Sequence, residues 1–575
     1  MKDPVLREVV QNALDTIADE VGVFAARSAY SPFVNQSGEI ATGIFDPRGR
    51  LVAQTKRGLA HASAVRIGQR ELLKDWPLDS MEEGDAFVFN DQFRGGIHPT
   101  DVMVFRPIFH QGRVAFMYGA MMIVSDLGGL SAAGLPANAT ECFHEGLIIP
   151  AVRLYKGGQP NRDVVGMIEA NSRTPRRVMG DIRALVAGGN MAGLRMQELI
   201  AKYGYEELLS IIEELMDRSE KLTRQGIERI PDGSYHGSYV VEEDGIVPDK
   251  SYTVRGEITV RGGDIKFDFS GSDPQARGAV NSSYSQSLSG VVFALLCFLD
   301  AEIPMNEGFY RPLEVELPLG SIVNPRYPAA CNIRIGTVQA IVDSIIQAFS
   351  PAFPDRVQAP GGTPHSLLAA GRHPKTGELW AFLDPHFGPC GARSTMDGVD
   401  CMPDPLFAGQ SGYGRNIENY ELEFPIRYER FEVWRDSGGP GKWRGGCGLL
   451  KEVTFLAEND LTVRAVDRCR IPPQGLAGGK PGKGGGWIIN RGRPDEWNPP
   501  PKQTNIRVPA GTMVTQLVSG GGGFGSAYER APELVARDVR EGHVSIEAAA
   551  REYRVVIDRK TGQVDADATT QLRKA

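Results

Sequence analysis

The chain has 575 residues, of which 41% are hydrophobic and 23% are charged, and its formal net charge is −8. Such a length exceeds what one hydrophobic core usually serves, so we expect two or more domains. The composition is that of an ordinary globular protein. The thinly spread, mildly acidic charge excludes a basic surface of the kind that follows a nucleic-acid backbone.

The cysteines and the apolar runs indicate where in the cell the protein is expected. Seven cysteines are scattered without C-x-x-C spacing, and the opening residues MKDPVLREVVQ contain no apolar signal core. These features are typical of a cytoplasmic protein with free thiols. The longest apolar run begins at Val291 and stops at Asp300. It is too short to cross a bilayer, so we expect no membrane segment.

The first third of the chain predicts helices around a strand pair. Asp3 and Pro4 suit the start of a helix whose apolar residues recur at helical spacing up to Ser31. The segment GIFDPRGRLVAQ has two short apolar runs about a Pro-Arg-Gly turn and predicts a hairpin. Helical patterns follow over residues 180–203 and 205–230.

The remaining two thirds alternate between strand and helix patterns. Strands are expected between residues 231 and 273, helices after 279 and after a Pro-rich turn near 328, and short strands with glycine-rich turns over 428–519. A helical segment, a final strand and a charged tail from about Lys560 close the chain. The pattern predicts a mixed α/β (α+β) fold of multi-layer mixed sheets with helices, and a Gly-rich β-domain near the C-terminus.

We divide the chain into four expected domains. They are an N-terminal α/β domain (1–230), a central α+β domain (231–425), a Gly-rich β-domain (426–530) and a C-terminal helix with a tail (531–575).

The stretch from Asn90 to Gly129 has the highest density of candidate functional residues. It contains a Gly-Gly turn, His98, Asp101, two apolar strand-like runs, and Asp126 before a second glycine pair. Glycine permits close backbone approaches, so a polar side chain beside it can be directed into a cleft.

His98 and Asp101 form an H-x-x-D motif that has two interpretations. In a turn or strand, one imidazole nitrogen and one carboxylate oxygen at this spacing can converge on a cation, and such donors suit Zn, Mn or Fe. Alternatively, the two side chains form a hydrogen-bonded pair that only orders a loop.

Blocks of sequence along nearly the whole chain resemble the hydantoinase B family. They include the Asn90–Gly129 stretch and the segments GIFDPRGRLVAQ, NSRTPRRVMGDIRALVAGGN, AVNSSYSQSLSG, WRDSGGPGKWRGGCG and DRCRIPPQGLAGGKPG, in the order of the family. The family also contains the second half of 5-oxoprolinase, caprolactamase subunits and the large subunits of biotin-independent acetone and acetophenone carboxylases.

The resemblance implies a divalent metal (Zn, Mn or Fe) held by this chain. By that resemblance the ligands are Glu39, His98 and Asp101. The fourth family position, usually a histidine, falls in IVSDLGG, where Ile123 and Val124 stand. Isoleucine cannot bind a metal, and three protein ligands are the usual minimum at a catalytic zinc.

Other residues are candidates for roles beside the metal. Asp126 is the candidate general base, or the group that orients a water, because it lies beside glycine pairs on the same stretch as His98 and Asp101. His61, Arg393 and Asp397 are candidate substrate contacts. GGKPGKGGG and Gly520–Gly525 match no nucleotide fingerprint and are interpreted as turns. ATP is therefore expected on a separate hydantoinase A-like subunit, in a hetero-oligomer.

Three functions stay open at this point. The first is a subunit of an ATP-dependent hydrolase that opens hydantoin, oxoproline or lactam rings. The second is a subunit of an ATP-dependent ketone carboxylase, since Ile123 and Val124 give a more apolar wall than two histidines would. The third is a non-catalytic assembly subunit in which the metal site has decayed.

Overall fold

The computed structural model describes residues 4–31, 34–35, 38–55, 59–132, 134–247, 249–299, 302–402 and 416–574. The chain divides into two compact units. The first consists mainly of Met1–Tyr239 and Thr253–Ala348, and the second mainly of Val240–Tyr252, Phe349–Gly412 and Asn416–Ala575. The division into four domains expected from the sequence stays a prediction.

The first unit is built around a seven-stranded sheet with the strand order β2-β1-β5-β4-β3-β6-β7. All its strand pairs are antiparallel. The strands are β1 (Ile40–Phe45), β2 (Leu51–Gln54), β3 (Ala86–Phe89), β4 (Asp101–His110), β5 (Arg113–Ile123), β6 (Val152–Lys156) and β7 (Gln159–Pro160). The expected hairpin at residues 43–54 is confirmed, because β1 pairs with β2.

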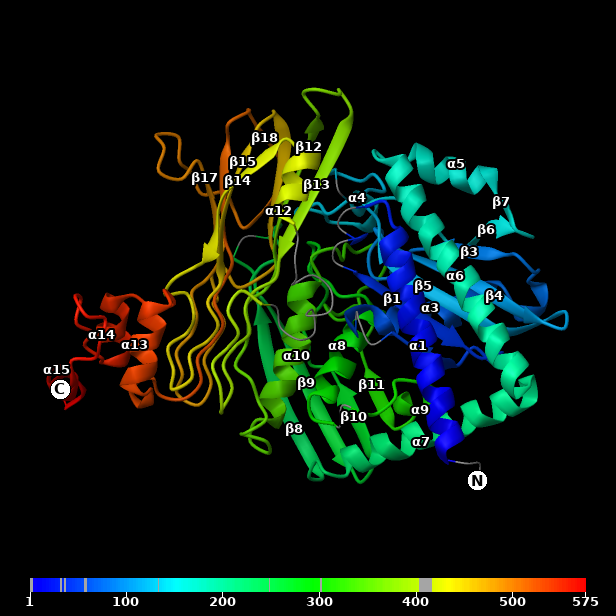
Figure 1. The fold of residues 1–575 in the computed structure, drawn as a ribbon, viewed down its shortest axis with the longest axis horizontal. Helices are drawn as coiled ribbons and strands as arrows, with labels where there is room; N and C mark the ends of the chain where they lie inside the picture. Colours follow the sequence, from blue (N-terminus) through cyan, green and yellow to red (C-terminus); the bar gives the residue numbers. More distant parts are fainter. Residues whose placement is uncertain are drawn as a thin grey trace. The chain divides into compact units, whose positions relative to one another are not determined.

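Helices cover both faces of this sheet (Figure 1). They include α1 (Pro4–Ser28), α3 (Leu59–Asp75), α5 (Arg162–Ala170), α6 (Pro175–Tyr203) and α7 (Tyr205–Ile227). Val102 and Val104 of β4 belong to the core under α1 and α6, whereas Met103 and Phe105 approach Gly68 of α3. Side chains of a strand alternate between faces, so α3 lies opposite α1 and α6.

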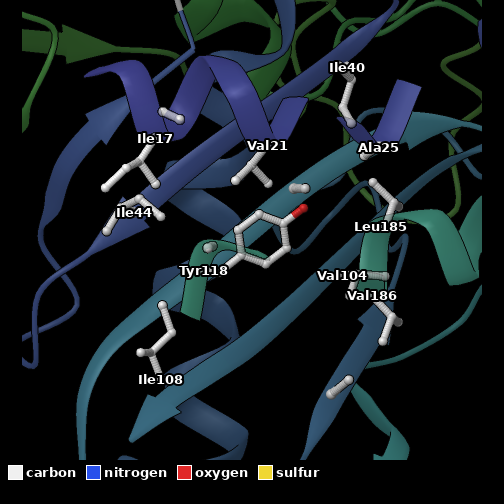
Figure 2. Close-up of a cluster of buried hydrophobic side chains, with 14 of the residues drawn as sticks. Ile17, Val21, Ala25, Ile40, Ile44, Val104, Ile108, Tyr118, Leu185 and Val186 are labelled. Atoms are coloured by element: carbon white, nitrogen blue, oxygen red, sulfur yellow. The ribbon is translucent and has the colours of Figure 1, made fainter. Parts of the chain in front are cut away.

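Apolar packing fixes α1 and α6 on their face of the sheet. Figure 2 shows Tyr118 of β5 among side chains that include Val21 of α1 and Leu185 of α6. The Tyr118 side chain is fully buried, and a Cβ atom at Gly188 would lie 2.8 Å from its hydroxyl oxygen. The glycine therefore lets α6 approach the sheet closely.

A second sheet of the first unit has the order β11-β10-β9-β8. Its strands are β8 (Gly233–Val241), β9 (Tyr252–Arg261), β10 (Asp264–Asp268) and β11 (Leu313–Glu316). The pair β10/β11 is parallel. The other described helices of the first unit are α4 (Cys142–Glu145), α8 (Tyr284–Leu296), α9 (Glu307–Tyr310) and α10 (Ile335–Phe349), together with a short 3-10 turn, η1 (Leu78–Ser80).

The second unit contains two four-stranded sheets, β13-β12-β16-β18 and β14-β15-β19-β17. Their strands are β12 (His365–Arg372), β13 (Leu379–His386), β14 (Ile426–Val433), β15 (Leu449–Phe455), β16 (Asn459–Ala465), β17 (Gly486–Ile489), β18 (Lys502–Val508) and β19 (Met513–Leu517). Buried residues of both sheets, such as Phe382 and Val453, share one core. The two sheets therefore pack against each other around one core, to which β12 and β13 also contribute.

The glycine run after β19 differs from the expected turns. Gly520 to Gly523 form neither turns nor helix. The amide groups of Gly521, Gly522 and Gly523 donate to the carbonyl oxygens of Gly446, Pro360 and Lys480. A Cβ at Gly521 would lie 2.3 Å from the carbonyl oxygen of Cys390. Glycine is needed here for close packing of several main chains.

The C-terminal part is helical. Its helices are η2 (Ala527–Glu529), α13 (Pro532–Arg540), α14 (Ile546–Tyr553) and α15 (Ala566–Lys574), whereas α12 (Ile417–Glu423) lies between β13 and β14. The expected charged tail thus contains a helix, and the expected final strand is a single bridge between Ile557 and Val564. Among the described residues, no helix combines the length and apolarity needed to cross a membrane. The fold is mixed α/β, as expected, but its sheets are mostly antiparallel.

Candidate functional site

Three of the predicted ligand positions lie across neighbouring strands at one end of the seven-stranded sheet. Asp101, the first residue of β4, pairs with Ile123, the last residue of β5. Ile40, the first residue of β1, pairs with Met122, and Glu39 precedes it. Across the sheet, the strand order β1-β5-β4 therefore places Ile123 between Glu39, which precedes β1, and Asp101.

His98 and Asp101 form a close, buried pair. The distance between His98 Nε2 and Asp101 Oδ2 is 3.1 Å, and both residues are about 1% exposed. His98 Nδ1 lies 2.8 Å from the hydroxyl of Thr100. Burial raises the pKa of Asp101 to about 6, and the charge of Arg334 opposes this shift. The two predicted residues are thus adjacent, with their side chains at ion-pair distance.

Glu39 and His61 form a second buried pair in the same unit. His61 belongs to α3, and its Nε2 lies 3.7 Å from Glu39 Oε1. Burial, reinforced by the charge of Arg334, lowers the pKa of His61 to about 3. The imidazole is therefore neutral at physiological pH.

Arg334 is the residue that the sequence interpretation missed. It directly precedes α10, it is 5% exposed, and its Nη2 lies 3.5 Å from Asp101 Oδ2. Burial lowers the pKa of the guanidinium, while the charges of Asp101 and Glu39 raise it. The signal in the sequence was one arginine inside the otherwise uncharged segment AACNIRIGT. Nothing in that segment shows which carboxylate it faces.

Glu145 holds the turn that carries Arg334. Its Oε1 accepts hydrogen bonds from the amide groups of Cys331 and Asn332, at 2.7 and 2.6 Å. Burial raises the pKa of Glu145 to about 7, although these hydrogen bonds oppose the shift. The buried carboxyl therefore anchors the start of α10.

Asp126 is fully buried and engaged by its neighbours. Its Oδ1 accepts from the amides of Gly128 and Arg173, at 2.9 and 3.0 Å, and its Oδ2 lies 3.1 Å from Arg173 Nη1. These contacts fix the loop after β5. The role of Asp126 as general base stays a prediction.

Arg393 and Asp397 belong to the second unit. Arg393 Nε donates to Gln358 at 3.0 Å. Asp397 forms a two-fold ion pair with the guanidinium of Arg530, at 2.6 and 2.8 Å. Burial would raise the pKa of Asp397, but the hydrogen bonds and charges of Arg530 and Arg444 together lower it. As substrate contacts, both residues stay predictions.

The donor atoms do not fit a three-ligand metal centre. Within the described part of the chain, no three His, Cys, Asp or Glu side chains come together in a way that could hold a metal ion. The position opposite Asp101 is the side chain of Ile123, which has no donor. A catalytic metal usually has three protein ligands. Metal binding by this chain stays a prediction.

A pocket of about 780 Å³ borders the segment that leads to His98. Gln92, Phe93 and Gly95 line it together with Tyr284 of α8 and Tyr327. The rings of Phe93 and Tyr327 meet edge to face at 5.5 Å. The pocket is of the size that accepts a small organic molecule.

Comparison with known proteins identifies relatives over the whole length. The chain is 29% identical to the B-type subunit of a putative D-/L-hydantoinase from a Pseudomonas strain, over 100% of this chain and 98% of that protein. It is 30% identical to the beta subunit of caprolactamase from Pseudomonas jessenii, over 100% and 99% of the two chains. The crystal structure of the ATP-dependent caprolactamase from that organism superposes with a TM-score of 0.90 at 28% identity, covering 100% of both chains.

The model of the hydantoinase B/oxoprolinase family matches residues 3–527. This match spans most of the chain and agrees with the resemblance inferred from the sequence blocks. The chain belongs to the hydantoinase B/oxoprolinase family.

Proposed function

We propose that this chain is the B-type subunit of an ATP-dependent enzyme that opens a cyclic amide ring such as hydantoin, oxoproline or a lactam. The observation that carries this proposal is the full-length correspondence with the beta subunit of caprolactamase, at a TM-score of 0.90. Both named relatives are subunits, which implies a partner subunit for this chain as well.

The partner, by this proposal, is a hydantoinase A-like subunit that binds ATP. An unstrained cyclic amide resists hydrolysis, so ATP first phosphorylates its oxygen to give an activated intermediate. This chain then acts in the second step, in which one water attacks the activated carbon and the ring C–N bond breaks, which gives the amine and an acyl phosphate. A second water then attacks the acyl phosphate and releases phosphate and the carboxylate.

The buried groups of the first unit suit this second step. Water must be excluded except at the reacting carbon, and His98, Asp101 and His61 are all buried. Carboxylate and imidazole groups are the usual proton acceptors for an attacking water. Asp126, His98 and Asp101 are the proposed catalytic residues, and His61, Arg393 and Asp397 the proposed substrate contacts.

The test is a substrate panel with the reconstituted complex. The chain is co-expressed with a hydantoinase A-like partner, and hydantoins, 5-oxoproline and caprolactam are supplied with ATP. Ring-opened product is measured by mass spectrometry. Acetone and acetophenone with bicarbonate form a second arm, because carboxylation there, without ring opening in the first arm, would replace the hydrolase by the carboxylase.

Alanine substitutions of two histidines, one in the proposed site and one outside it, test the role of His98. His98→Ala is expected to lower ring opening at least 100-fold, since general acid–base groups contribute about 10²–10⁴-fold. His236→Ala, at an exposed position of β8, is expected to leave the rate unchanged. Equal loss in both variants would point to damaged folding and not to a role for His98.

A further inference from the structure

Arg334 is held firmly in a buried position beside the predicted ligand residues. The Glu145 carboxylate fixes residues 331 and 332, and the amide of Ile333 donates to the carbonyl oxygen of Ala279 at 2.8 Å. The guanidinium at residue 334 therefore has a defined place at the start of α10, inside the first unit.

The guanidinium faces acid groups and acceptor atoms. Its Nη2 lies 3.5 Å from Asp101 Oδ2, its Nη1 donates to the carbonyl oxygen of Asn332 at 3.3 Å, and its Nε approaches Gln286 Oε1 at 3.5 Å. Asp101 Oδ2 has no hydrogen-bond partner of good geometry among the described residues. Arginine remains charged in proteins, so this site contains a permanent buried cation.

A buried cation and a bound metal are alternatives here. Glu39 and Asp101 bring two carboxyl groups to the same end of the sheet, and carboxylates that are buried need a compensating positive charge. A divalent metal would need three donors at one point, and no such group of His, Cys, Asp or Glu occurs among the described residues. His98 Nε2 lies beside Asp101 Oδ2 at 3.1 Å, and the residue paired with Asp101 is Ile123, which has no donor. The guanidinium already supplies positive charge beside Asp101.

We propose that Arg334 is the cation of this site, taking the place that a divalent metal would otherwise fill between Glu39 and Asp101. In the reaction, the guanidinium binds the oxygen anion of the substrate. This second part rests on the proposed function, whereas the first part does not.

The first part is tested by metal content. The complex is purified after growth with added Zn, Mn and Fe, and its metals are measured by mass spectrometry in wild type and in Asp101→Ala. We expect equal, substoichiometric amounts of these metals in both. About one metal ion per chain in wild type that is lost in Asp101→Ala would overturn the proposal, whatever the substrate proves to be.

A designed pair of variants tests the exchange of cations directly. Ile123→His places an imidazole opposite Asp101, and Arg334→Gln removes the guanidinium. Zinc alone is titrated calorimetrically into Ile123→His and into the double variant, after circular dichroism has shown both to be folded. We expect the double variant to bind at least 100-fold more tightly. A double variant that binds no better than Ile123→His contradicts the proposal.

The second part is tested by turnover of the complex on a substrate that it opens. Arg334→Gln is expected to lower kcat about 10²–10³-fold, the usual loss on removing one group that stabilises an oxygen anion. Arg334→Lys keeps the charge and is expected to recover part of kcat. A chelator of zinc and iron that leaves Mg²⁺ free is expected to have no effect. Full turnover by Arg334→Gln would overturn this part and leave the proposed function intact.

Discussion

At the scale of single residues, the first unit concentrates ionisable groups that lie almost completely out of water. Glu39, His61, Asp101, Glu145 and Arg334 are all buried in the same unit. Charges that lose their hydration need partners or change their protonation. The free energy of unfolding should therefore change with pH as individual buried residues gain or lose a proton.

Glu145 gives the clearest pH prediction. Because the folded state holds its proton more tightly, up to a pKa of about 7 against an ordinary value of 4.5, stability from this group is present at low pH and is lost as pH rises through that window. Glu145→Gln keeps an acceptor oxygen for residues 331 and 332 but cannot ionise. Thermal unfolding of both proteins should show the wild type losing roughly 1–3 kcal/mol relative to the variant between pH 5 and 8.

A constant stability difference between the two proteins across this pH range would contradict the raised pKa of the buried Glu145 side chain. A difference that changes with the opposite sign would also do so, since it would mean that the fold favours the ionised form.

Substitution of Asp126 tests whether this residue acts in catalysis or only in holding the structure. If it is the general base, Asp126→Asn should lower kcat about 10²–10⁴-fold in the reconstituted complex. The control is Asp181→Asn, since Asp181 is another buried carboxylate, which accepts from the amides of Tyr30 and Ser31. That variant should lower the melting temperature with kcat kept. Full turnover by Asp126→Asn would show that Asp126 has only a structural role, through its contacts in the loop after β5.

At the scale of elements, patterns that depend on neighbouring residues could be predicted from the sequence. The helices α1, α6 and α7 and the β1/β2 hairpin follow from apolar spacing, a proline at a helix start and a turn. The conformation of the glycine run at 520–523 could not be predicted, because its amide groups donate to the main-chain carbonyl oxygens of residues 360, 446 and 480. Such partners are distant in sequence and leave no local pattern.

The glycines of α6 offer a matched pair of variants. Gly188→Ala would bring a methyl group within 2.8 Å of the buried Tyr118 hydroxyl, whereas nothing lies within 4 Å of a Cβ at Gly193. Overpacking costs about 1–3 kcal/mol, while alanine in an open helix position adds about 0.5–1 kcal/mol of stability. Thermal unfolding should place Gly188→Ala below wild type and Gly193→Ala above it; equal shifts would contradict this packing of α6.

At the scale of the whole molecule, part of the candidate site was predictable and part was not. His98 and Asp101 stand out locally, as an H-x-x-D motif beside glycines, and Glu39 was found by resemblance. That Ile123 lies between Glu39 and Asp101 depends on the strand order β1-β5-β4. Arg334 reaches the site from more than two hundred residues away in the chain. Sheet order and such distant contacts are set by tertiary packing, which apolar periodicity does not encode.

Assembly with a partner is the central prediction at this scale. If this chain performs the second step only, it should not consume ATP by itself, and the partner alone should not release ring-opened product. Assays of each protein alone and of the complex, with phosphate and product followed together, measure this. Ring opening by either protein in isolation would show that the two steps are not divided as proposed.

The most direct measurement follows ADP and ring-opened product during the first turnover of the complex, in wild type and in His98→Ala. If this chain handles the activated intermediate, the variant keeps a first burst of ADP while product formation falls at least 100-fold. Loss of ADP formation and of product to the same extent, in a complex that still assembles, would contradict the assignment of the second step to this chain.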